Sequence, residues 1–147
     1  MKNMMLQAKN FSMIMLCTAL LFAAGCKDNS DPYVNPGTVE DPQWKITVDT
    51  TDMTTSMTAI VKVAFTDKQG TLAAFMGDDC CAIADYIEGL YWLYISPAAN
   101  VNAGVSLKFY SPDLKRIYVA KQTFPFVNDG QKGTVSAPYT PEWEVVK

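Results

Sequence analysis

Residues 90–95 read Leu-Tyr-Trp-Leu-Tyr-Ile, a run of aromatic and aliphatic side chains that directly follows a Glu-Gly turn at 88–89. Aromatic residues favour β-strands, in which successive side chains point to opposite faces. The set that contains the central aliphatic residues is expected to face a core: Tyr91, Leu93 and Ile95. Trp92 and Tyr94 are then left on the opposite face of the strand.

A similar alternation continues on both sides of this run. Strand-like segments occur at 46–48, 59–65, 72–76, 80–87, 105–109 and 116–126, with a last one near the C-terminus. Turn residues separate them, and no window beyond the first 25 residues shows a helical period. About eight short strands at near-regular spacing predict an all-β fold, an antiparallel two-sheet β-sandwich of immunoglobulin-like or jelly-roll-like type.

Two local expectations follow from this pattern. The polar segment 66–70 has the length of a hairpin turn, so we expect it to join the strands on either side. Phe75 and Phe109 lie within apolar strand segments, and we expect both rings to be buried in the core.

The N-terminus has the features of an export signal. Two lysines precede an apolar segment at 11–24, which is too short to span a bilayer. Ala24-Gly25 then leads directly into Cys26, an arrangement that resembles a bacterial lipobox. We expect residues 1–25 to be a lipoprotein signal peptide and Cys26 to carry the lipid. The alternative is a simple secretory signal whose cleavage falls near Cys26.

Composition and charge narrow the possible partners. Residues 26–43 are polar and contain three prolines, which predicts a tether, and residues 44–147 then form the β-sandwich domain. Removal of the signal leaves ten basic and 15 acidic residues, a net charge of −5. An acidic chain without histidine or a basic patch has no electrostatic reason to bind nucleic acid.

Side chains that carry chemistry are sparse. Asp78-Asp79 is the one tight carboxylate cluster, and a Gly-Asp-Asp run is ordinary turn sequence. No calcium-binding loop surrounds this pair or Asp129. The adjacent Cys80 and Cys81 are expected to point to opposite strand faces as free thiols, whereas a vicinal disulfide is the alternative. We therefore expect no enzyme activity, no metal and no cofactor.

Three motifs in the middle of the chain resemble a known module. Residues 72–80 read Leu-Ala-Ala-Phe-Met-Gly-Asp-Asp-Cys and are followed by the strand 90–95 and by Leu-Lys-Phe-Tyr at 107–110. This order resembles a β-sandwich module of secreted and surface proteins of the Bacteroidetes type, over roughly residues 44–143. The resemblance implies the fold and a surface location, but no particular activity. Cys81-Ala82 departs from the module, which usually continues with Arg-Gly.

Outward-facing aromatic residues suggest binding. If strands 90–95 and 105–109 pair, Trp92 and Tyr94 share a face with Lys108 and Tyr110, and these four are the predicted ligand-binding residues. Flat rings with polar edges suit sugars or a protein partner. The alternative is that the tether, a loop or the strand at 116–126 covers this face.

Together these observations predict a lipid-anchored lipoprotein of the outer membrane or cell surface. It would act as a non-catalytic binding module for a surface glycan or protein. The alternative is a structural or assembly subunit of a surface fibre or outer-membrane complex.

Overall fold

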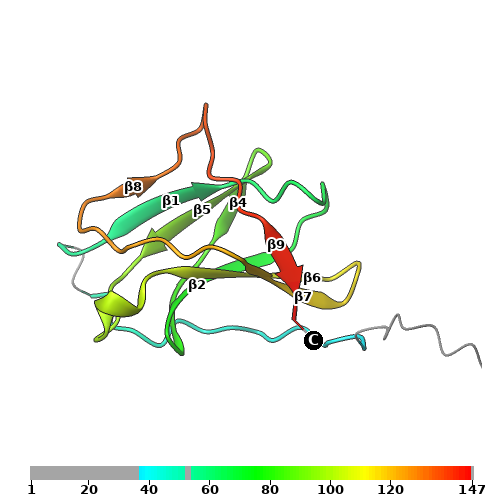
Figure 1. The fold of residues 1–147 in the computed structure, drawn as a ribbon, viewed down its shortest axis with the longest axis horizontal. Coiled ribbons are helices and arrows are strands. Elements are labelled where there is room, and N and C mark those ends of the chain that lie inside the picture. Colours follow the sequence, from blue (N-terminus) through cyan, green and yellow to red (C-terminus); the bar gives the residue numbers. More distant parts are fainter. Residues whose placement is uncertain (1–36, 52–53, 147) are drawn as a thin grey trace, which may run out of the picture. The chain divides into compact units, whose positions relative to one another are not determined.

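The computed structural model describes residues 37–51 and 54–146 (Figure 1). Within them lie a short 3-10 turn, Val101–Ala103, and nine strands. The strands are β1 (Met57–Val61), β2 (Thr71–Met76), β3 (Asp79–Ile83), β4 (Asp85–Ile87), β5 (Leu90–Ile95), β6 (Ser106–Ser111), β7 (Arg116–Ala120), β8 (Gln131–Lys132) and β9 (Trp143–Val145).

Two sheets make up the domain, as the sequence predicts. The four-stranded sheet has the order β4-β5-β1-β8, and the five-stranded sheet has the order β3-β2-β6-β7-β9. All neighbouring strands are antiparallel except β1 and β8, which are parallel. The prediction of an all-β, antiparallel two-sheet sandwich is confirmed.

The chain changes sheet where the sequence predicts a hairpin. β1 belongs to the four-stranded sheet and β2 to the five-stranded sheet, so the prediction that 66–70 closes a hairpin is wrong. Residues 62–70 instead cross from one layer to the other. Gly70 passes so close to the Phe109 ring and the Tyr110 carbonyl that no side chain fits there. A second change of sheet falls at Ala84, between β3 and β4.

The main core lies between the sheets and follows the predicted alternation. Tyr91, Leu93 and Ile95 of β5 are at most 3% exposed. Phe109 of β6 is fully buried opposite them, with its ring centroid 5.7 Å from that of Tyr91. The inward-facing set of β5 and the burial of Phe109 are therefore as predicted.

A second, smaller cluster lies on the outer face of the five-stranded sheet. Phe75 is buried, as predicted, but it packs here with Ala73 and Cys80 rather than in the main core. Trp44 covers it in an edge-to-face contact, with ring centroids 5.6 Å apart. Side chains of a strand alternate between its two faces, and Leu72, Ala74 and Met76 take the inward positions of β2. Phe75 therefore points to the outer face of the sheet.

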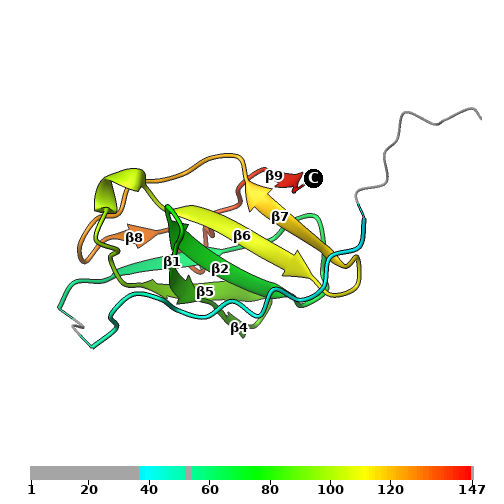
Figure 2. The ribbon, with the colours of Figure 1, turned by 90° about the horizontal axis from the view of Figure 1, so that it is seen from below.

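Residues 37–47 form a covering segment along this outer face, seen below β2 and β6 in both Figure 1 and Figure 2. The Val39 amide donates to the Lys115 carbonyl, and the Thr47 amide donates to the Cys80 carbonyl. The Cys80 amide donates in turn to the Thr47 hydroxyl at 3.0 Å. The described end of the predicted tether therefore packs on the sheet, and Ile46 and Val48 form no strand.

The two adjacent cysteines are separated by the sheet itself. Cys80 lies in the outer cluster and Cys81 in the main core, and both thiols are free. The β2–β3 register pairs Ala74 with Ala82 and Phe75 with Cys80, which makes Cys81 an extra, bulged residue. The prediction of free thiols on opposite faces is confirmed.

These thiols predict a loss of stability at alkaline pH. Burial raises the pKa of Cys80 and of Cys81 above the ordinary value of 9.0, so the folded chain keeps protons that the unfolded chain releases. Their contribution to stability is fully present below about pH 9 and is lost as the pH rises through the folded pKa. Urea midpoints measured between about pH 7 and 10 should fall at the alkaline end, and less steeply in Cys81→Ala. If the urea midpoint falls equally steeply with pH in the two proteins, this explanation is wrong.

Candidate binding surfaces

The structure does not bring the four predicted ligand-binding residues together. Trp92 and Tyr94 lie on β5 of the four-stranded sheet, whereas Lys108 and Tyr110 lie on β6 of the five-stranded sheet. The two pairs point outward from opposite layers of the sandwich. The prediction of one shared face is wrong, because β5 pairs with β1 and β4, not with β6.

Lys108 and Tyr110 both lie at the covered face. The Lys108 ammonium is 4.2 Å from the centroid of the Phe75 ring. Tyr110 is only 6% exposed, and its hydroxyl donates to the Val39 carbonyl at 3.4 Å. On the five-stranded sheet, the alternative interpretation therefore holds: the tether covers the outer face.

The outer face of the four-stranded sheet carries the other pair. Tyr94 is 61% exposed, and Trp92 is half-buried. Trp92 lies between Asp85 of β4 and Ile60 of β1, in direct cross-strand register with each. Residues so placed touch through their side chains, which explains the partial burial of the indole.

We call this surface the aromatic strip and define it by four outward residues of β4 and β5: Ile87, Leu90, Trp92 and Tyr94. Ile87 is 50% exposed, and Leu90, which pairs with it across the strands, is half-buried. The strip combines apolar area with the polar edges of two aromatic rings. Such a surface can stack on a sugar ring or pack against a protein.

Sequence reasoning missed a second exposed aromatic residue. The alternation over 59–65 places Phe65 on the buried phase, but β1 ends at Val61 and Phe65 is 41% exposed. Its ring packs against Tyr118, with centroids 4.4 Å apart, and contacts Trp143 edge-to-face. The ring is therefore held on one side and open on the other.

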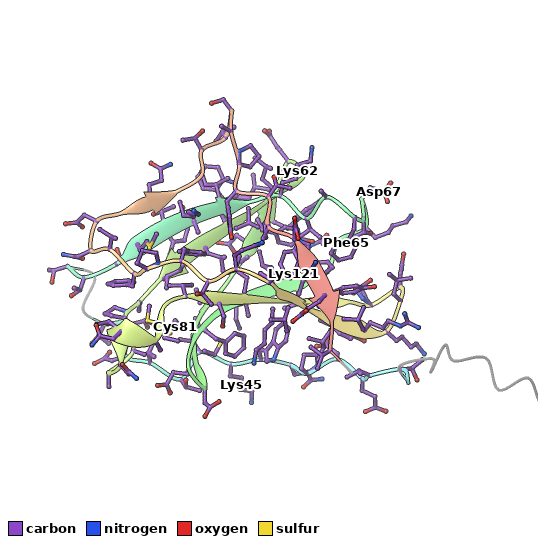
Figure 3. All side chains as sticks on the ribbon, in the orientation of Figure 1. Lys45, Lys62, Phe65, Asp67, Cys81 and Lys121 are labelled. Atoms are coloured by element: carbon purple, nitrogen blue, oxygen red, sulfur yellow. The ribbon has the colours of Figure 1, made fainter. Side chains whose placement is uncertain are left out.

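Two hollows meet at this ring. The first, of about 430 Å³, lies between the β1–β2 connection and the β4–β5 turn, and we call it the Phe65 hollow. The second, of about 690 Å³, lies toward β7 and β9 and is lined by the ion-paired Lys121 and Glu142. Both hollows share Ala64 and Phe65. Figure 3 shows Lys62, Phe65, Asp67 and Lys121 at this end of the domain.

The described residues show neither a metal-binding cluster of His, Cys, Asp and Glu nor a helix long and apolar enough to cross a membrane. Asp78 is exposed in the turn between β2 and β3, which Gly77 makes with a positive φ of 64°. Asp79 accepts a hydrogen bond from the Thr47 hydroxyl at 3.3 Å and thereby helps to fix the covering segment. This contact of Asp79 is structural.

Comparisons with known proteins add no relative. No protein-family model, curated protein or solved structure matches the chain. Support for a function therefore comes from the surfaces themselves.

Proposed function

We propose that the protein is a lipid-anchored, extracytoplasmic lipoprotein that acts as a non-catalytic binding module for a surface glycan or protein. The single observation that carries this proposal is the open aromatic strip. Tyr94 is 61% exposed, Trp92 lies on the same face of β5 two residues earlier, and the exposed Ile87 extends the strip beside Leu90. Tyrosine and tryptophan supply large contact areas with hydrogen-bonding edges, and both are frequent at binding hot spots.

The sheet edges give less support to the alternative of assembly by strand addition. That mode needs a long, unpaired edge strand. The described edge strands β4, β8 and β9 have only three, two and three residues. The fourth edge strand, β3, is already hydrogen-bonded through Cys80 to Thr47 and through Cys81 to Ser96.

The anchor and location in this proposal rest on the sequence around Cys26, which lies outside the described residues. Two or three acyl chains on this cysteine would attach the protein stably, whereas one would bind only marginally. The binding module would then act within a linker's reach of a membrane surface.

Tyr94→Ala tests the binding proposal. Because the side chain is mostly exposed, the free energy of unfolding should change by no more than about 0.5 kcal/mol. Retention on an array of surface glycans, or on a surface-protein extract, should weaken by about tenfold or more if the ring is a hot spot. Leu114→Ala is the matched control, since Leu114 is 50% exposed at the β6–β7 turn, on the five-stranded sheet, away from the strip.

Two outcomes would contradict the proposal. One is retention that is unchanged in both Tyr94→Ala and Trp92→Ala. The other is concentration-dependent self-association that persists in these variants, which would favour the structural or assembly subunit.

A further inference from the structure

The Phe65 hollow has the size and the mixed lining of a small-molecule site. Its volume of about 430 Å³ lies within the range of about 300–1,000 Å³ that is typical of ligand pockets. Its chemistry comes from six side chains: Lys62, Phe65, Asp67, Lys68, Tyr86 and Tyr91. They come from the β1–β2 connection, from β4 and from β5, so segments far apart in sequence build one concavity.

One wall of the hollow is the open side of Phe65. The other side of this ring is fixed by contacts to Tyr118 and Phe109, whose centroids lie 4.4 Å and 5.7 Å from its own. A fixed aromatic ring that is still 41% exposed offers a flat apolar surface with little entropy left to lose. The carbon-bound hydrogens of a pyranose ring pack well on such a surface.

A buried hydroxyl group lies against the same space. Tyr91 lines the hollow and is 3% exposed, and its oxygen accepts a hydrogen bond from the Gly70 amide at 2.9 Å. The described residues provide no acceptor for its own proton, so the hydroxyl can still donate. Burial raises the pKa of Tyr91, which keeps that proton in place at neutral pH.

Charge is the third feature of the lining. Lys62 and Lys68 both line the hollow, and neither forms an ion pair with a described residue. The ion pair between Lys121 and Glu142 belongs to the second hollow. Asp67 is the single acid in the lining, so the hollow carries one net positive charge in a chain whose net charge is −3. A carboxylate would complement the two lysines.

We propose that the Phe65 hollow binds a carboxylated sugar, with the pyranose ring on Phe65, the carboxylate at Lys62 and Lys68, and a ring oxygen accepting from Tyr91. Uronic and sialic acids share this chemistry. The hollow is separate from the aromatic strip, and this inference does not depend on the function proposed for the strip.

Calorimetric titration of the full chain in detergent tests the inference, with glucuronate, N-acetylneuraminate, glucose and acetate as probes. Glucuronate or N-acetylneuraminate should bind, and the tighter of the two identifies the source of the carboxylate. Glucose and acetate should each bind at least about tenfold more weakly, because each lacks one half of the recognised chemistry.

The variants separate a specific site from general charge. The double variant Lys62→Gln/Lys68→Gln should weaken binding of the acidic sugar by about tenfold. Lys45→Gln should not weaken it, since Figure 3 places Lys45 across the domain from Lys62 and Phe65. Phe65→Leu tests the contribution of the ring to binding, and its thermal midpoint is measured in parallel. If Phe65→Leu fails to fold, the double lysine variant alone tests the site.

Three results would overturn the inference. They are no binding of either acidic sugar, equal binding of glucose and glucuronate, and equal losses in Lys45→Gln and in the double lysine variant. Tyr94→Ala should bind the acidic sugar as the unmodified chain does, so failure at the strip and failure at the hollow are distinguishable.

Discussion

Phe109→Ala should lower the free energy of unfolding by about 3–5 kcal/mol. The Phe109 ring is fully buried and contacts the rings of Tyr91, Phe65 and Trp143, which come from β5, the β1–β2 connection and β9. Its removal leaves a cavity between the two sheets. The side chains around this cavity come from three different elements, so they cannot all move inward to fill it. Because a domain of this size is stable by only about 5–15 kcal/mol, the loss is a large part of the total.

Chemical denaturation measures this effect, with the midpoint and the slope recorded for each protein. Tyr94→Ala is the exposed control and should change the free energy of unfolding by no more than about 0.5 kcal/mol. A loss below about 1 kcal/mol in Phe109→Ala would mean that the ring is not in the core.

Cys26→Ala should release the protein from the membrane altogether. Each buried methylene of an acyl chain contributes about 0.8 kcal/mol, so a cysteine with two or three chains gives stable attachment and an alanine gives none. Membrane fractionation of cells should find the unmodified chain in the membrane and the variant in the soluble fraction. Intact-mass measurement of the membrane form should give an acylated species that starts at Cys26.

Cys17→Ala is the control for this experiment, because Cys17 lies inside the predicted signal and should not be acylated. That variant should stay in the membrane. Membrane retention of Cys26→Ala, or an unmodified soluble protein in cells that make the original chain, would rule out the anchor.

The strands could be predicted from sequence because the period of two is strong in this chain. The inward set of β5 and the burial of Phe109 both follow from it. The pairing of strands could not be predicted in the same way, since an alternating strand fits either sheet equally well. For this reason the sequence places Lys108 and Tyr110 on the wrong surface: both point outward from β6, but β6 belongs to the other sheet.

Phe65 shows a second limit of sequence patterns. Apolar residues alternate from Ala59 to Phe65, yet the strand ends at Val61 because the chain must leave the four-stranded sheet to reach β2. Val63 is still buried, but Ala64 and Phe65, which follow it in the connection, are both exposed. The polar run at 66–70 gives no information about where the strand before it stops.

The covering segment has a mechanical consequence. Any pull on the chain from before residue 37 reaches the domain through residues 37–47, which Val39 and Thr47 tie to the five-stranded sheet with a few hydrogen bonds. Under load this segment would peel away before any core strand separates, and Trp44 would leave the Phe75 ring. Tension would then uncover Cys80, whose thiol could report the detachment while the sandwich remains folded.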